Sequence, residues 1–109
     1  MDETITPQAR YDRLCEAFFR RGEAAPSEKK GFGGSALTVN GRIFAMLTRE
    51  RLVVKLPKAR VDALVVSGGG VRFDANKGRP MKEWLTIDPA LEAEWAALAE
   101  EALGFVRGE

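Results

Sequence analysis

The stretch SALTVNGRIFAMLTRERLVVKL, residues 35–56, decides the fold because it contains two short chain reversals between apolar runs. Asn40-Gly41 is the strongest short signal for a hairpin, since both turn positions require positive φ. Arg49-Glu50 predicts a second, less diagnostic tight turn before RLVVKL. Strands joined by tight turns run antiparallel. We therefore expect an antiparallel meander with strands at about 32–39, 42–48 and 51–56.

The glycine-rich segment KKGFGG, residues 29–34, raises the question of a phosphate-binding loop. In such a loop the glycines lead into a helix N-terminus, and the lysine follows them. Here the lysines come first and the glycines lead into a strand. We interpret the segment as the entry to a hairpin and not as a nucleotide site.

Helices are predicted on both sides of the meander. Thr6 and Pro7 provide an N-cap and a first-turn proline for a helix that ends near Gly22. Pro57 opens a short helix that the glycines after Ser67 terminate. Segments 71–73 and 81–87 are two further strands. Asp88-Pro89 opens the last helix, whose apolar stripe consists of Leu91, Trp95, Leu98, Ala99, Ala102, Leu103 and Val106.

The element order is therefore α-β-β-β-α-β-β-α. This order predicts an α+β fold with a single antiparallel sheet of about five strands and the N- and C-terminal helices packed on one face. The 109 residues form one domain, 1–109, with a core at about 7–107.

Composition narrows the function. No apolar run reaches the ~20 residues of a membrane span, and the polar N-terminus and single cysteine favour a cytoplasmic protein. There is no histidine, which excludes Ser-His-Asp and Cys-His chemistry and imidazole metal ligands. Cys15 falls on an apolar stripe and is interpreted as a core residue. Asp74 and Asn76 are typical of a turn. We expect no catalytic residue, cofactor or metal.

Charge is divided along the chain. Residues 28–82 contain twelve Lys/Arg and four Asp/Glu, whereas residues 83–109 contain one and seven. Either the basic middle forms an anion-binding surface, or it faces the acidic tail and is partly neutralised. A local cluster of cations, Lys77, Arg79 and Lys82, is either a solvated loop or a site for an anion or acidic partner.

A regular hairpin register pairs Val39 with Arg42 and Leu37 with Phe44, and the second turn pairs Leu47 with Leu52. One sheet face then suits the helix-covered core. The other face is a candidate interaction face composed of Leu37, Arg42, Phe44, Met46, Arg51, Val53 and Lys55, with Val39 beside them. This face either stacks single-stranded nucleic acid, is buried in a dimer or under a protein partner, or is covered by the same chain.

These motifs together resemble the TfoX (Sxy) N-terminal domain family. The resemblance rests on the aromatic-Gly-Gly strand, the VNGRIFAML hairpin, RLVVKL, the segment Gly78-Arg79-Pro80-Met81, and the tryptophans Trp84 and Trp95. It extends from about Tyr11 to Val106, and the related MmcQ/YjbR-like proteins are the neighbouring possibility.

The resemblance implies a bacterial α+β module. The family's competence regulator acts with a cyclic-AMP-dependent transcription factor and carries a second domain, for which this chain has no room. The family has no agreed catalytic or ligand-binding residues, so the resemblance assigns no such role to any residue of this chain. We expect a non-enzymatic regulatory module that works through protein contacts, with transcriptional regulation as a plausible setting. Its partner would be another protein or a second copy of the chain in a homodimer. The alternatives are nucleic-acid binding through the basic sheet region, or a small-molecule-binding protein or enzyme.

Overall fold

The computed structural model describes residues 6–22, 24–26, 36–74 and 81–108. The predicted order of helices and strands is confirmed, with two additions: a two-residue strand after the first helix and a 3-10 helix before the last one. The elements are α1 Pro7–Arg21, β1 Ala25–Pro26, β2 Leu37–Val39, β3 Arg42–Thr48, β4 Arg51–Lys55, α2 Lys58–Val66, β5 Gly70–Arg72, β6 Trp84–Ile87, η1 Pro89–Glu94 and α3 Trp95–Arg107.

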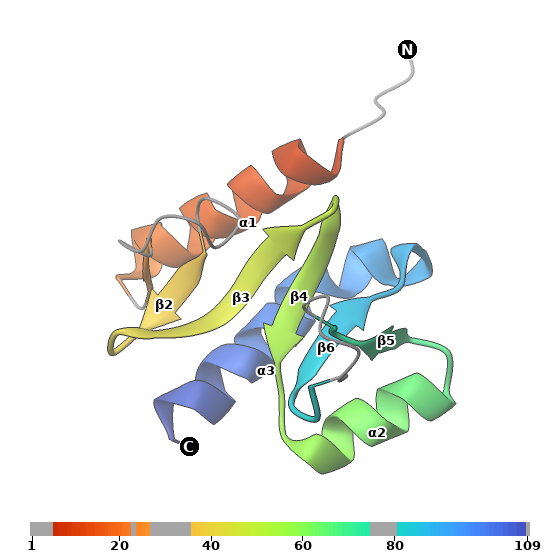
Figure 1. Ribbon diagram of the computed structural model, residues 1–109. Helices are drawn as coiled ribbons and strands as arrows, with labels where there is room; N and C mark the ends of the chain where they lie inside the picture. The colour runs from red at the N-terminus through yellow and green to blue at the C-terminus, as the bar shows by residue number, and fades with distance from the viewer. Residues whose placement is uncertain (1–5, 23, 27–35, 75–80, 109) are drawn as a thin grey trace.

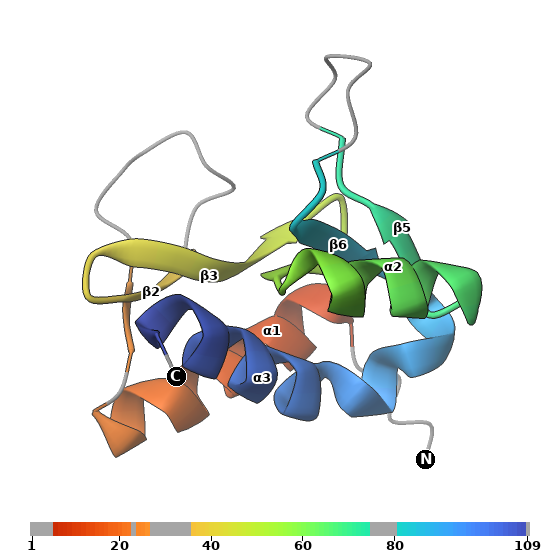
Figure 2. The same ribbon diagram turned by 90° about the horizontal axis from the view of Figure 1, so that it is seen from below.

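The strands form one antiparallel sheet in the order β1-β2-β3-β4-β6-β5 (Figure 1). The meander β2-β3-β4 is the predicted one. After α2 the chain forms the edge strand β5. It then reverses direction to form β6, which pairs with both β4 and β5 and lies between them. Figure 2 shows α1 and α3 on one face of the sheet, as predicted, with α2 beside β5. On the opposite face, called the outer face below, the described residues form no helix.

The predicted ends of α1 are confirmed. The Thr6 hydroxyl accepts a hydrogen bond from the Ala9 amide at 3.1 Å, and Pro7 occupies the first turn. The helix ends at Gly22, whose φ of 72° is left-handed. The stripe at helical spacing, Tyr11, Leu14, Cys15 and Phe18, is buried against the sheet.

The last helix begins later than predicted. Residues 89–94 form the 3-10 helix η1, interrupted at Leu91 by φ −103° and ψ 26°, and the regular helix starts at Trp95. The predicted apolar stripe is nevertheless correct, because α3 buries Trp95, Leu98, Ala99, Ala102 and Leu103. Leu91 and Val106 are half-buried against the same core.

Both tight turns are present. Asn40 and Gly41 have φ of 53° and 78°, and Arg49 and Glu50 have φ of 53° and 66°. Two positive φ values are typical of the hairpin turn that matches the twist of the flanking strands. The β3–β4 register agrees with the prediction, including the pair Leu47–Leu52.

The predicted β2–β3 register is wrong beyond its first pair. Val39 pairs with Arg42 and Thr38 with Ile43, but Leu37 pairs with Ala45 and not with Phe44. One step on β2 thus spans two steps on β3. Phe44 is the extra residue of a β-bulge, and a bulge reverses the alternation of side chains beyond it.

The bulge redistributes the side chains between the two faces. Leu37, Val39 and Phe44 belong to the helix-covered core, where the Phe44 ring meets Phe18 edge-on with centroids 5.6 Å apart. A second, smaller cluster lies on the outer face and contains the buried residues Ala36, Met46 and Val53, with Ile43, Phe73 and Trp84 half-buried around them.

Candidate interaction surface

The apolar part of the predicted interaction face does not form an exposed surface. Leu37, Phe44 and Val53 have no exposed area, and Met46 is 3% exposed. The bulge turns Leu37 and Phe44 into the helix-covered core, whereas Met46 and Val53 are buried in the outer-face cluster. Of the three alternatives for this face, burial within the same chain therefore holds for these four side chains, and their use as contact residues does not.

The cations of that predicted face do not share one surface either. Arg42 is exposed and pairs with the core residue Val39, so it leaves the sheet on the helix-covered side. Arg51 is exposed on the outer face, since it precedes the inward-facing Leu52. Lys55 is half-buried on the outer face, and its Nζ lies 5.7 Å from the centre of the Trp84 ring.

The predicted loop cluster can be placed only in part. Lys77 and Arg79 lie outside the described residues. Lys82 is exposed in the turn that precedes β6. Asn76 also lies outside the described residues, and Asp74 is half-buried directly after β5.

A shallow hollow of about 320 Å³ lies on the outer face between the β3–β4 turn and β5. Arg49 and Arg51 bring two guanidinium groups to it, and Asp74 is the single carboxylate among its described lining residues. The other lining residues are Thr48, Val53, Val71, Arg72, Phe73 and Thr86. Sequence reasoning included Arg51 and Val53 in the candidate face but missed the hollow, because only the strand order brings β5 and β6 next to β4.

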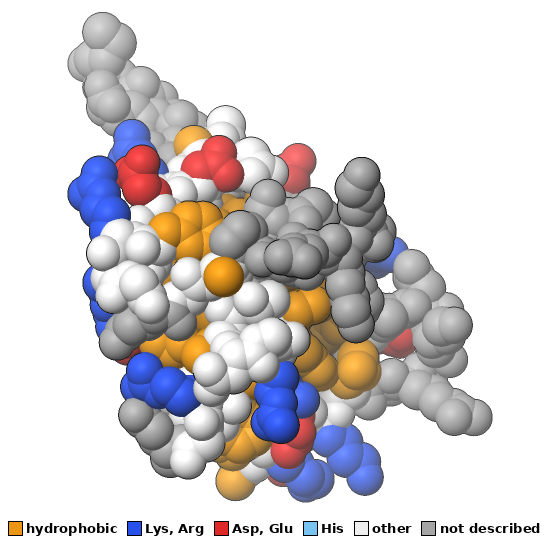
Figure 3. Space-filling view, turned by 90° about the vertical axis from the view of Figure 1, so that its left-hand side faces the viewer, with side chains coloured by type: hydrophobic (Ala, Val, Ile, Leu, Met, Phe, Trp, Pro, Cys, Tyr) orange, Lys and Arg blue, Asp and Glu red, His pale blue; other side chains and the backbone are white. Residues whose placement is uncertain are grey.

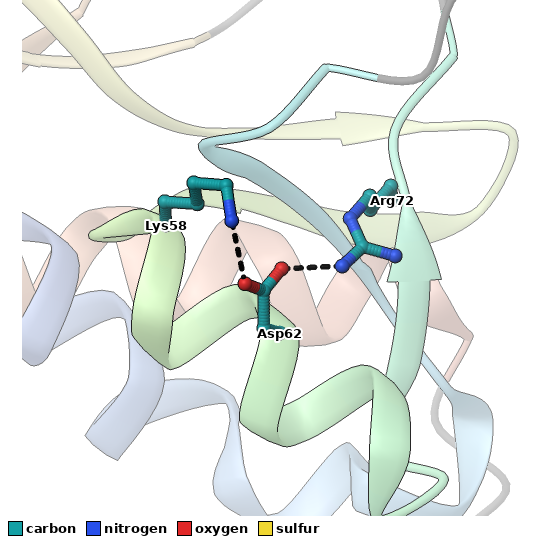
Figure 4. A network of polar contacts seen from close by, with 3 residues as sticks. All are labelled: Lys58, Asp62 and Arg72. Atoms are coloured by element: carbon teal, nitrogen blue, oxygen red, sulfur yellow. Dashed lines mark hydrogen bonds and ion pairs between the residues drawn. The ribbon is translucent and has the colours of Figure 1, made fainter.

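On the helix-covered side, three charged side chains connect α2 to β5 (Figure 4). Arg72 pairs with the core residue Leu85 in the sheet and therefore faces α2, where its guanidinium donates to Asp62. Lys58 Nζ donates to the other oxygen of the same carboxylate at 2.9 Å. These two hydrogen bonds, that of Lys58 first, hold the pKa of Asp62 below its usual value. Two cations thus share one carboxylate beside β5.

The acidic tail forms ion pairs with two cations, one of which, Arg60, belongs to the basic middle segment. Arg60 of α2 donates to Glu101 of α3 at 2.7 Å. Arg21 of α1 donates from Nη2 to Glu100 at 2.6 Å. On the side of the molecule shown in Figure 3, lysine and arginine side chains lie in separate places between hydrophobic and acidic ones. These contacts favour mutual neutralisation of the two charged regions over one continuous basic patch.

The titratable groups of the core are poorly suited to chemistry. Burial raises the pKa of the Cys15 thiol to about 11, so the nucleophilic thiolate is scarce near neutral pH. Burial likewise raises the pKa of the neighbouring Tyr11 well above its usual value. Across the described part of the chain, no group of three Cys, Asp or Glu side chains is arranged to hold a metal ion.

The described residues also include no helix that is long and apolar enough to cross a membrane.

Comparison with curated proteins and with solved structures gives no match. Comparison with protein-family models gives a match to the TfoX N-terminal domain over residues 21–105. This range begins at the end of α1 and includes the whole sheet, α2 and nearly all of α3. The chain therefore belongs to the TfoX N-terminal domain family.

Proposed function

We propose that the protein is a small, non-enzymatic regulatory or interaction module that acts in the cytoplasm through protein contacts, with transcriptional regulation as its setting. Membership of the TfoX N-terminal domain family supports a regulatory role. The absence of histidine from the sequence and the raised pKa of Cys15 favour binding over catalysis.

The observation that carries this proposal is that β5, the helix before it and the segment that bonds to its end each have an exposed apolar side chain. Val66, at the end of α2, is 88% exposed, and Val71, in β5 itself, is 58% exposed. Met81 is 41% exposed, and its amide donates to the carbonyl of Phe73 directly after β5. Exposed apolar side chains that lie together are typical of protein interaction sites.

Nucleic-acid binding through the outer face is the second candidate. It is favoured by the exposed Arg51 and by Lys55 above the Trp84 ring. It is disfavoured because Lys58, Arg60 and Arg72 lie on the helix-covered side and are paired with carboxylates, which leaves the outer face fewer cations of the basic segment for a phosphate backbone.

The two candidates are separated by crosslinking an affinity-tagged chain in its source cells and identifying the captured proteins by quantitative mass spectrometry. We expect a captured protein, or a second copy of the chain, that is lost with Val71→Asp and retained with Phe19→Asp. Phe19 is an exposed apolar residue of α1, away from β5, and serves as the matched control.

In parallel, binding to labelled DNA is measured across a salt series. Genuine phosphate contacts weaken binding steeply as salt rises, with a slope near −0.9 per contact on duplex DNA. Salt-dependent DNA binding without a captured protein would favour nucleic-acid binding over the proposed role in protein contacts. If no protein is captured and no DNA is bound, both candidate functions are rejected.

A further inference from the structure

The strand β5 forms one edge of the sheet. β5 is the last strand in the sheet order, so within the described chain no strand lies on its far side. The Phe73 amide donates to Trp84, and the Gly69 carbonyl accepts from Asp88, so these positions face β6. Because alternate residues of an antiparallel strand point to opposite sides, the backbone groups of Arg72 are directed outward, whereas Gly70 is buried.

A strand added along this edge would alternate its side chains between two different surroundings. The residue opposite Val71 would lie on the outer face, beside an exposed apolar side chain and next to the hollow lined by Arg49 and Arg51. Its neighbours would lie on the helix-covered side, next to Arg72.

Positive charge predominates on both sides of the edge. On the outer face, the hollow is lined by Arg49, Arg51 and Arg72 and by one described carboxylate, Asp74. On the helix-covered side, Arg72 and Lys58 share the single carboxylate of Asp62. A partner strand that presents carboxylates around one apolar residue would therefore match this edge in charge and in shape.

We propose that β5 is the docking edge for an extended acidic segment of a protein partner, which adds a strand to the sheet. An apolar side chain of the segment packs on Val71, and its carboxylates meet the cations on the two sides of the edge. This inference rests on the proposed function and gives the chemistry of the partner. A protein segment fits better than nucleic acid, because an extended peptide supplies backbone donors and acceptors in the register that the outward groups of β5 require.

The test uses the full chain and a fluorescently labelled peptide with the sequence Glu-Glu-Val-Glu-Glu, flanked by serines. Fluorescence anisotropy at low salt should give a dissociation constant of about 100 μM or tighter, which is typical of a short segment. Two probes of matched length serve as controls: one with lysine in place of glutamate, and one with alternate backbone amides methylated. Both should bind at least about tenfold more weakly.

A matched pair of protein variants tests the surface itself. Arg51→Glu, at the hollow, should weaken peptide binding by about tenfold. Arg42→Glu makes the same charge change at an exposed arginine on the opposite face and should change binding less than about twofold. Because both side chains are exposed, both variants should fold, which circular dichroism verifies.

Three results would overturn the inference: no binding of the acidic peptide at millimolar concentration, equal binding of the methylated peptide, or equal effects of the two variants. Tighter binding of a labelled oligothymidine, lost with Arg51→Glu, would assign the surface to nucleic acid instead. If a partner captured in cells still binds the Arg51→Glu chain, this inference fails while the proposed function stands. The proposed function itself fails only when no protein is captured.

Discussion

Gly70 is the residue at which the sheet leaves no room for a side chain. A Cβ built there would lie 2.2 Å from the carbonyl oxygen of Thr86, which is backbone of β6 and cannot move aside cheaply. The neighbouring Gly68 is constrained differently: its φ of 85° is left-handed, but nothing lies within 4 Å of a Cβ. The sequence predicted only that this glycine run ends α2, because close approach of another strand leaves no local signal.

Alanine substitutions separate these two roles. Gly70→Ala should lower the free energy of unfolding by about 2–4 kcal/mol, because β5 and β6 must move apart. Gly68→Ala should lower it by about 1 kcal/mol, the usual penalty for a side chain at positive φ. Urea denaturation measures both. If both variants lose the same free energy of unfolding, β5 and β6 can make room for a methyl group at Gly70, and the close contact with Thr86 does not constrain this position.

At the scale of elements, the sequence predicted what local chemistry determines. The caps of α1, both hairpin turns and the ends of β3 and α2 follow from residues within a few positions of each boundary. The bulge at Phe44 does not follow from nearby residues, because it depends on which side chains of the paired strands fill the core. A regular register would have put Ile43 against the helices and Phe44 outside. The bulge lets Phe44 fill the core beside Phe18.

The bulge makes a quantitative prediction. Phe44→Ala should lower the free energy of unfolding by about 3–5 kcal/mol, as expected for a large buried side chain. Ile43→Ala, at a half-buried position on the outer face, should lower it by about 1–2 kcal/mol. Urea denaturation of the two variants tests this order. A larger loss for Ile43→Ala would support the regular register instead.

The carboxylate of Asp62 is the link between α2 and β5, and its effect should depend on pH. Its pKa in the folded state lies below the ordinary value of 3.8, so its contribution to stability is complete above that value. It is lost as the pH falls below 3.8 through the lowered pKa. Asp62→Asn should therefore reduce the urea midpoint at pH 7, and the difference from the parent chain should narrow towards pH 3.

High salt should also narrow this difference, because the groups involved are partly exposed. Glu94→Gln is the matched control, since it removes one exposed carboxylate that has no ion pair within the described structure. If Asp62→Asn and Glu94→Gln shift the midpoint equally, the contacts of Asp62 with Lys58 and Arg72 do not hold α2 to β5.

At the scale of the whole molecule, the site was harder to predict than the fold. The element order and the covered face follow from the sequence, but β6 lies between β4 and β5, and the order of elements along the chain does not reveal this. The hollow and the docking edge at β5 both depend on that arrangement. The predicted face failed for the same reason: tertiary pairing, not local pattern, decides which side of the sheet a residue occupies.

At this scale the acidic tail also forms ion pairs with other parts of the chain. The acidic final helix contacts cations of two other helices, through Glu100 with Arg21 of α1 and Glu101 with Arg60 of α2. All four side chains are more than a third exposed, so each pair stabilises the fold by no more than about 1 kcal/mol. Their arrangement joins the three helices, in addition to the apolar stripe of α3.

Reversing both carboxylates, Glu100→Lys with Glu101→Lys, should lower the free energy of unfolding by about 1–2 kcal/mol at low salt, since attraction becomes repulsion at two places. The loss should fall to less than about half in 1 M salt, where the Debye length is near 3 Å. Glu94→Lys, at the N-cap of α3, is the control; it loses only the favourable effect of a negative charge at the helix N-terminus and should change stability by less than about 1 kcal/mol. A double variant as stable as this control would mean that the apolar stripe alone holds α3 in place. The acidic tail would then be a solvated surface, and the basic segment would remain available to an external anion.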